Sequence, residues 1–387
     1  MTEHELLIAT RRDLHRHPEI GFEERRTAGI VAERLAAAGY ELRTGVAVTG
    51  VVGTLRGGRG AGPTLLLRAD MDALPIQEQA SHAYASATPG RMHACGHDAH
   101  VAVGLAVAER LARRRDDFAG EVRYVFQPAE EGMGGARRMV EEGVLGGVDA
   151  AIGLHVWLPM PKGTVGLVDG PQMAGSQEFR ITVEGRGGHG AMPHDTIDSV
   201  LVASHIVVAL QSIVARNVAP MDAAVVSVGS VRAGDAMNVI AANAVLEGTI
   251  RAFRTDLQDL LRERITAVAE GVAAGLGARA RVDFSTLLFP PTVNDPELAK
   301  FVRGVAAEVV GEENVRSGRE VRTMAAEDFA EFATRVPGCF FFLGGSDAAA
   351  GIDHPHHSPH FDIAEEVLPH GVEILERAAI AYLNGRS

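Results

Sequence analysis

The chain has 387 residues, of which 46% are hydrophobic and 22% charged, as in ordinary globular proteins. Its formal net charge of -13 argues against nucleic acid as a partner. We find no apolar run as long as a membrane span and no signal peptide, so we expect no membrane partner. Two cysteines far apart in sequence, Cys95 and Cys339, make a disulfide framework unlikely and fit a reducing, cytoplasmic location.

The first predicted elements are two amphipathic helices, over residues 5–16 and 27–38, followed by strands over 46–55 and 64–68. The run Leu65-Leu66-Leu67 is typical of a strand that is covered on both faces. Two acids, Asp70 and Asp72, follow this strand directly. Ligands of open α/β sheets bind at the carboxyl ends of the strands, so these acids mark one edge of the expected sheet.

Residues 91–100 concentrate side chains that hold transition metals. They include Cys95 and His97, together with His93, Asp98 and His100. A lone Cys or His is more often a core or surface residue, but this density favours a metal site. The small apolar residues 101–108 predict a helix over 101–114, which places the cluster in the loop before it.

Two further strands are expected to bring polar residues to the same edge of the sheet. The strand over 121–127 is followed by Pro128 and by the acid pair Glu130-Glu131, and the strand over 150–155 ends in His155. Adjacent acids alone would suggest the solvated start of a helix. At the end of an apolar strand, one acid could bind metal while the other takes a proton from water. This convergence predicts a hydrolytic metal site.

The pattern changes near Gly175. The order strand, helix, two strands, helix, strand predicts a ferredoxin-like domain, with strands over 178–184, 223–231, 243–253 and 280–287 and helices over 195–216 and 255–276. Elements of the first domain then resume, with helices over 296–310, 326–334 and 365–383 and a strand over 338–343. We therefore expect an α/β fold in which a catalytic domain of residues 1–175 and 290–387 contains an inserted domain of residues 176–289.

Short motifs along nearly the whole chain resemble one family. The chain is similar to the metal-dependent amidohydrolases and metallopeptidases of the aminoacylase and carboxypeptidase G family, in the branch of hippurate hydrolase and the indoleacetyl-amino-acid hydrolases. The resemblance implies a zinc-peptidase-like catalytic domain with an inserted lid and dimerisation domain. The matching motifs are Arg68-Ala-Asp-Met-Asp-Ala-Leu-Pro75, His93-Ala-Cys-Gly-His-Asp98, Gln127-Pro-Ala-Glu-Glu-Gly132, Gly153-Leu-His-Val156, Gly187-Gly-His-Gly-Ala-Met-Pro-His194, Asn238-Val-Ile240, Gly248-Thr-Ile-Arg251 and Glu327-Asp-Phe329.

The resemblance also implies roles in the catalytic domain. Two divalent ions, Zn, Mn, Co or Ni, would be held by five ligands: Cys95, His97, Glu131, His155 and His357. His357 is preferred to the other tail histidines because it fits the pattern His-Ser-Pro-x-Phe. Glu130 would be the general base that activates water and then protonates the leaving amine. Asp72 would orient a ligand such as His97, although a strand-end turn residue is the simpler interpretation of it.

In the inserted domain the resemblance implies that His189 reaches an active site, typically that of a partner subunit, and steadies the developing oxyanion. Asn238 would also face the substrate, and Arg251 could clamp its carboxylate. Alternatively, His189 is a histidine of a hinge loop, Asn238 is a turn residue and Arg251 forms a cross-strand salt bridge. A homodimer or homotetramer is expected. Gln177 and His356 depart from the family's pattern and leave the substrate pocket open.

The expected function is metal-dependent hydrolysis of the amide bond of small N-acyl amino acids. A dipeptidase or a biosynthetic N-acetyl deacylase on the same fold is the nearest alternative. A non-catalytic binding module would be expected to have lost some of these residues, but Glu130 and all five ligands are present. A structural zinc site needs neither a spare adjacent acid nor a second metal.

Overall fold

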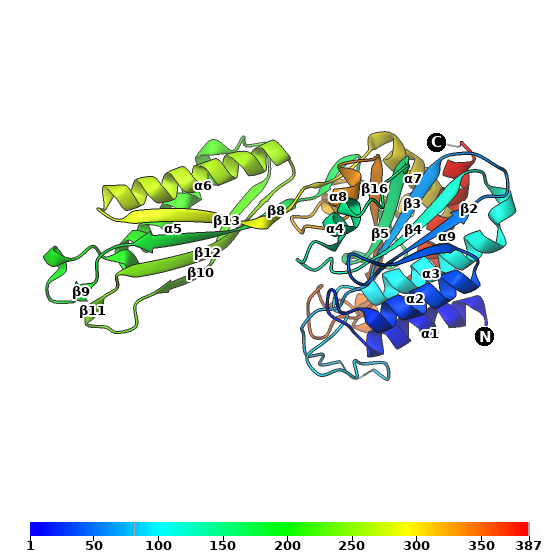
Figure 1. Cartoon of the computed structure of the whole chain (residues 1–387), viewed down its shortest axis with the longest axis horizontal. Coiled ribbons are helices and arrows are strands. Elements are labelled where there is room, and N and C mark those ends of the chain that lie inside the picture. The colour runs from blue at the N-terminus through cyan, green and yellow to red at the C-terminus, as the bar shows by residue number, and fades with distance from the viewer. Residues whose placement is uncertain (81, 386–387) are drawn as a thin grey trace. The chain divides into compact units, whose positions relative to one another are not determined.

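The computed structural model describes residues 1–80 and 82–385, and these form two compact units (Figure 1). Unit 1 comprises Met1–Gln172, Thr292–Arg322 and the chain from Asp328 onward. Unit 2 comprises Met173–Pro291 and the short segment Thr323–Glu327. Each unit has a sheet and a hydrophobic core of its own.

Unit 1 is built on an eight-stranded sheet in the order β1-β2-β4-β3-β5-β16-β6-β15. Its four central strands are parallel, so their carboxyl ends lie at one edge. β1 and β2 add to this core antiparallel on one side and β6 on the other. The strands are β1 (Glu41–Val46), β2 (Gly50–Arg56), β3 (Thr64–Asp70), β4 (Glu121–Gln127), β5 (Ala150–Pro161), β6 (Val165–Gly166), β15 (Val315–Arg316) and β16 (Gly338–Ser346).

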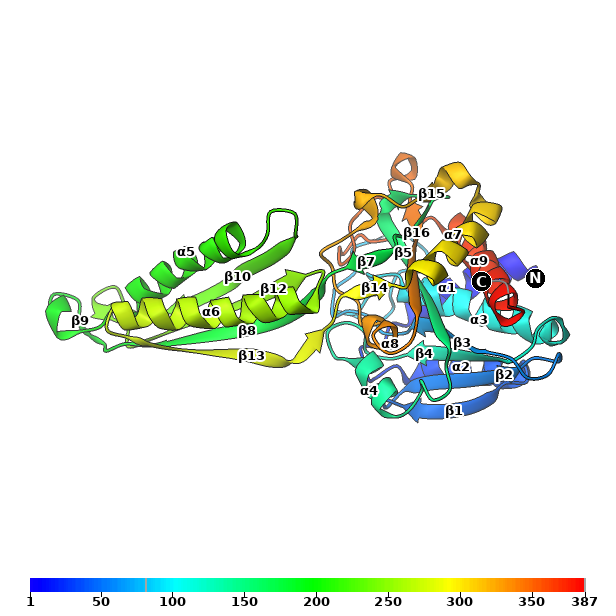
Figure 2. The same cartoon turned by 90° about the horizontal axis from the view of Figure 1, so that it is seen from above.

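Helices cover both faces of this sheet (Figure 2). The larger layer contains α1 (Glu3–Arg16), α2 (Arg25–Ala37), α3 (His97–Arg113), α7 (Pro296–Val310) and α9 (Leu368–Leu383). The smaller layer contains α4 (Gly135–Glu141) and α8 (Ala330–Ala333). The first turns of α3 are wholly buried, and their small Ala, Val and Gly residues allow the sheet and other helices to approach closely.

α3 begins earlier than the sequence predicted. Gly96, at φ 93°, makes the turn into the helix, so that His97, Asp98 and His100 lie in its first turn rather than in a preceding loop. Helix α5, by contrast, begins later than predicted, because the Asp198 carboxylate accepts hydrogen bonds from the backbone N–H groups of Val200 and Leu201 and caps it. The helix expected over 326–334 is only the single turn α8.

Unit 2 has the ferredoxin-like plan that the sequence predicted. Its antiparallel sheet has the order β10-β12-β8-β13, and both helices pack on one face of it. Along β8, Phe179, Ile181 and Val183 are buried and alternate with solvent-facing polar residues. The elements are β8 (Gly175–Glu184), α5 (Ser199–Asn217), β10 (Ala224–Ala233), β12 (Asn243–Ala252), α6 (Thr255–Gly275) and β13 (Arg279–Phe289).

One helix among the described residues, α5, is long and apolar enough to span a membrane, judged by length and composition alone. It is the exception to the expectation that no apolar segment reaches that length. Its buried face, which includes Ile206 and Leu210, packs into the core of unit 2. Its other face leaves Leu201 and Val208 exposed.

Candidate metal and catalytic centre

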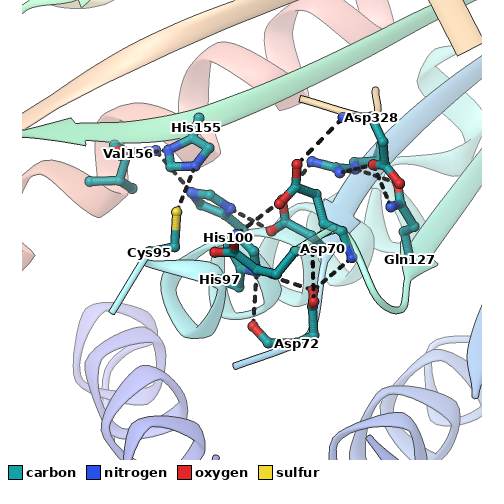
Figure 3. A network of polar contacts seen from close by, with 12 residues as sticks. Asp70, Asp72, Cys95, His97, His100, Gln127, His155, Val156 and Asp328 are labelled. Atoms are coloured by element: carbon teal, nitrogen blue, oxygen red, sulfur yellow. Dashed lines mark hydrogen bonds and ion pairs between the residues drawn. The ribbon is translucent and has the colours of Figure 1, made fainter. Parts of the chain in front are cut away.

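The carboxyl ends of β3 and β4 and the middle of β5 meet the start of α3, and Figure 3 shows Cys95, His97 and His155 there. His155 does not end its strand as predicted, because β5 continues to Pro161. Ligand atoms lie within 4.8 Å of one another in three overlapping groups. These groups are Cys95 with His97 and His155, Cys95 with Glu131 and His357, and His97 with Glu130 and Glu131. The structure therefore brings together all five predicted ligands and the predicted base. Their individual roles stay predictions.

Hydrogen bonds fix the ring orientation of two histidines. His97 Nδ1 lies 2.8 Å from the backbone oxygen of Asp72 and donates to it, so that in the neutral ring the lone pair is on Nε2. His155 Nδ1 donates to the Val156 oxygen at 2.7 Å, and its Nε2 faces Cys95 Sγ at 3.4 Å. A histidine that donates through one nitrogen and presents the other is the arrangement expected of a metal ligand.

Asp72 holds the loop that carries the acid pair. Its two carboxylate oxygens accept hydrogen bonds from the backbone N–H groups of Glu130 and Glu131, at 3.1 and 3.0 Å. This loop begins with Ala129 at φ 55°, a left-handed conformation that costs free energy for a residue with a Cβ. The Glu24 carboxylate accepts from the N–H of Ala129 at 2.9 Å and so helps to hold that conformation.

The predicted tail ligand, His357, also has a left-handed backbone conformation, with φ 66°. Its backbone N–H donates to the oxygen of Ala94 at 2.8 Å, which ties the tail to the loop of Cys95. Its Nε2 lies 3.3 Å from Oε1 of Glu131. The neighbouring His356 is half-buried, stacks on Trp157 and places Nδ1 3.9 Å from Cys95 Sγ.

A buried polar network behind these residues was not predicted from the sequence. Arg68 donates to Asp70, to Asp328 and to the side-chain oxygen of Gln127. Asp70 accepts from His100 Nδ1 at 2.6 Å, and His100 Nε2 accepts from the backbone N–H of Val156 at 2.9 Å. Asp70 thus links β3 to β5 beside His155. The motif Arg68-Ala-Asp-Met-Asp72 contained the signal for this network. The sequence alone could not tell whether Asp70 or Asp72 was the better placed acid.

The donor set fits a pair of cations. His97 Nε2 is buried and has no hydrogen-bond partner among the residues that the structure describes, and the solvent-shielded Glu131 Oε1 faces His357 Nε2 at 3.3 Å. Burial raises the pKa of the Cys95 thiol, and the Glu131 and Glu130 carboxylates raise it further. Burial acts against a charge on His97, but the carboxylates of Asp70 and Asp72 outweigh it and raise the pKa of that ring to about 10. Excess negative charge around a thiol is what divalent ions neutralise.

The three predicted residues of unit 2 do not form one group. His189 and Asn238 lie together on an exposed two-stranded ribbon, where β9 (Gly188–His189) pairs with β11 (Val239–Ile240) and Gly190 N–H donates to the Asn238 oxygen. Arg251 lies on β12, half-buried, and burial lowers its pKa. No ion pair of Arg251 within 4.0 Å occurs in the described part of the chain, so the cross-strand salt bridge considered for it is not formed.

A largely buried cluster of thiol, imidazole and carboxylate groups with a spare acid is the arrangement expected of a metal-dependent hydrolase. The chain belongs to the family described as Peptidase family M20/M25/M40, whose model matches residues 66–381. An Arabidopsis thaliana protein named IAA-amino acid hydrolase ILR1-like 4 is 41% identical over 380 residues, 97% of this chain and 86% of that protein. A Bacillus subtilis N-acetylcysteine deacetylase is 39% identical over 381 residues, 98% of this chain and 97% of the other.

Among solved structures, a Bacillus subtilis protein described as a dinuclear metal binding peptidase from the M20 family is 36% identical. It has a TM-score of 0.83, with 98% of each chain covered. The predicted family, the fold class and the enzyme class are confirmed, and the residues gathered here could hold a pair of metal ions as predicted.

Proposed function

We propose that this protein hydrolyses the amide bond of N-acyl amino acids. The observation that carries the proposal is the position of Glu130, a buried acid within 4.8 Å of ligand atoms on His97 and Glu131. Two relatives support the substrate class, because their names describe an amino acid acylated on nitrogen. One solved relative is described as a peptidase, so a dipeptide is the second candidate substrate.

The residues divide the chemistry between them. When bound, the two ions would polarise the scissile carbonyl and lower the pKa of a coordinated water. Glu130 would take the proton of the attacking water and deliver it to the leaving amine. His189 Nδ1 accepts from the Ala191 N–H, which puts the ring proton on Nε2 and leaves it able to donate to an oxyanion. Arg251 would bind the carboxylate of the amino-acid half.

We propose that the protein is a homodimer through unit 2. The exposed face of α5 carries Leu201 and Val208, and the neighbouring β10 is an edge strand of its sheet. An apolar helix stripe beside an unpaired strand edge suits a symmetric partner. His189 would then serve the partner's active site.

We further propose a cytoplasmic location, because Cys95 and Cys339 are both free thiols. Thiolate, imidazole and carboxylate ligands suit Zn, Mn, Co or Ni, and elemental analysis of the purified protein would distinguish among them.

The test is release of amino acid from N-acetyl and N-benzoyl amino acids and from dipeptides, with and without a chelator. Chelator-sensitive hydrolysis of the acyl compounds, faster than that of the dipeptides, is the expected result. Preference for dipeptides would move the assignment to the dipeptidase. No hydrolysis of any compound by protein loaded with each of the four metals would refute the proposal.

A further inference from the structure

A second group of metal-ligating side chains lies in unit 1 and shares no residue with the predicted catalytic ligands. It consists of His15, at the end of α1, and of Glu78 and His82, on the segment that precedes the Cys95 loop. Glu78 Oε1 lies 3.2 Å from His15 Nε2 and 3.2 Å from His82 Nε2. The three ligand atoms all lie within 4.8 Å of one another, close enough to share one ion.

The ring of His15 is oriented as that of a metal ligand. Its Nδ1 lies 2.8 Å from Oδ2 of Asp98, and both side chains are fully buried. Nε2 of the same ring is hydrogen-bonded to Oε1 of Glu78 at 3.2 Å, a contact in which a cation could replace the proton. A carboxylate that orients a histidine in this way is a common partner of bound metal.

His82 provides an independent observation. Both of its ring nitrogens are shielded from solvent, and neither makes a well-directed hydrogen bond with a described residue, although Nε2 lies 3.2 Å from Oε1 of Glu78. The ring is stacked on Tyr84 with centroids 3.8 Å apart, so it is held in place. A buried ring nitrogen without a well-directed hydrogen bond is unfavourable, and a bound cation would supply the missing contact.

The charges around this group leave room for a cation. The Arg11 guanidinium is already engaged by Asp98, by Asp362 and by Glu365. The charge of Glu78 is therefore left to be balanced by its two neighbouring histidines or by an ion between them.

We propose that His15, Glu78 and His82 bind a third divalent cation, zinc or a metal of similar ligand preference. Two imidazole nitrogens and one carboxylate oxygen are a ligand set that zinc accepts, with water in the fourth position. The ion would tie α1 to the segment that leads into Cys95. Asp98 follows His97 in the first turn of α3 and contacts His15. The ion would therefore also stabilise that turn through His15 and Asp98.

The test is the zinc content of the full-length protein after zinc loading and removal of loosely bound metal. His82→Phe keeps an aromatic ring over Tyr84, and we expect this variant to hold one zinc ion fewer than the wild type. His4→Phe, which changes an exposed histidine near the start of α1, is the matched control and should hold as many ions as the wild type.

A second background separates this site from the catalytic pair. A Cys95→Ser/Glu131→Gln variant should still bind one zinc ion, and adding His82→Phe should abolish that binding. Equal zinc content with and without His82 in both backgrounds would overturn the proposal and assign the balancing charge to a proton on a histidine. Hydrolysis is measured separately, so an inactive protein that still binds the third ion would count against the proposed function alone.

Discussion

The predicted site residues of the two units are held in opposite ways. In unit 1, Cys95, His97 and Glu130 sit at the end of a parallel sheet, and a buried network of charges surrounds them. In unit 2, His189 and Asn238 lie exposed on a short two-stranded ribbon. The first arrangement fixes each side chain before any ligand arrives, whereas the second leaves side chains to be ordered by a substrate or a partner.

This difference teaches where changes should affect stability and where they should affect only turnover. Residues in the network of unit 1 have structural partners, so their replacement should weaken the fold as well as the reaction. Residues on the ribbon of unit 2 have few structural partners, so their replacement should leave the fold intact.

The largest effect is expected from Glu130→Gln. Loss of the proton carrier should lower kcat by about 10²- to 10⁴-fold while metal content stays that of the wild type. Glu131→Gln, one position on, should instead lose metal and thereby separate the two acids. Wild-type turnover by a metal-loaded Glu130→Gln protein would remove Glu130 from the mechanism.

Arg68→Met should break the buried network. It leaves Asp70 and Asp328 buried without their guanidinium, and loss of one partner of a buried ion pair costs about 3–5 kcal/mol. Urea unfolding measures this loss, with Arg56→Met on the exposed end of β2 as control. Equal stability of the two variants would show that the network does not support the fold.

His189→Ala should reduce kcat by about 10²- to 10³-fold, the usual cost of losing one oxyanion donor, with the urea midpoint unchanged. Mixing this variant with Glu130→Gln subunits should restore part of the activity, because a mixed dimer has one site with both residues. If confirmed mixed dimers stay inactive, each subunit's site is self-contained.

The smallest effect is a pH dependence at Glu24. Burial raises the pKa of this carboxyl to about 7, even though Thr49 and the Ala129 N–H act in the opposite direction. The unfolded chain loses the proton near its ordinary value, so stability from this group is complete below about pH 4.5 and falls as the pH rises to about 7.

As the pH is raised from 5 to 8, the free energy of unfolding of Glu24→Gln should therefore increase relative to that of the wild type by at most about 3 kcal/mol. Urea unfolding at both values measures the gain, and Glu23→Gln, an exposed neighbour, provides the baseline. A difference from wild type that is the same at both pH values would place the ionisation elsewhere.

Much of the fold could be predicted from the sequence because hydrophobic patterns reflect burial directly. The run Leu65-Leu66-Leu67 became a core strand, and the alternation along β8 placed one face on the core. The start of α3 was missed because polar residues in its first turn, such as His97, mask the apolar signal. Short strands such as β1 were missed for a similar reason, since most of β1 is not buried.

The sequence predicted which side chains gather at the site, but not the hydrogen bonds and ion pairs that join them to their neighbours. Motifs pointed to the five predicted ligands and Glu130, and the structure brings these side chains together, but their roles stay predictions. The partners of Asp70 could not be predicted, because Arg68 and His100 meet it only through the pairing of β3 with β5 and the packing of α3. The left-handed backbone of Ala129 likewise depends on Glu24, which lies far away in the chain.

The inserted unit begins and ends on neighbouring strands. Ser176, in the first strand of unit 2, pairs with Phe289, in its last. The flanking strands β7 (Gly170–Met173) and β14 (Thr292–Asn294) are also paired with each other. An evolutionary insertion or a laboratory deletion at this point would thus require only a short bridge. We therefore expect the ferredoxin-like unit to be exchangeable, with residues 323–327 as the one other segment that a deletion would leave without its unit.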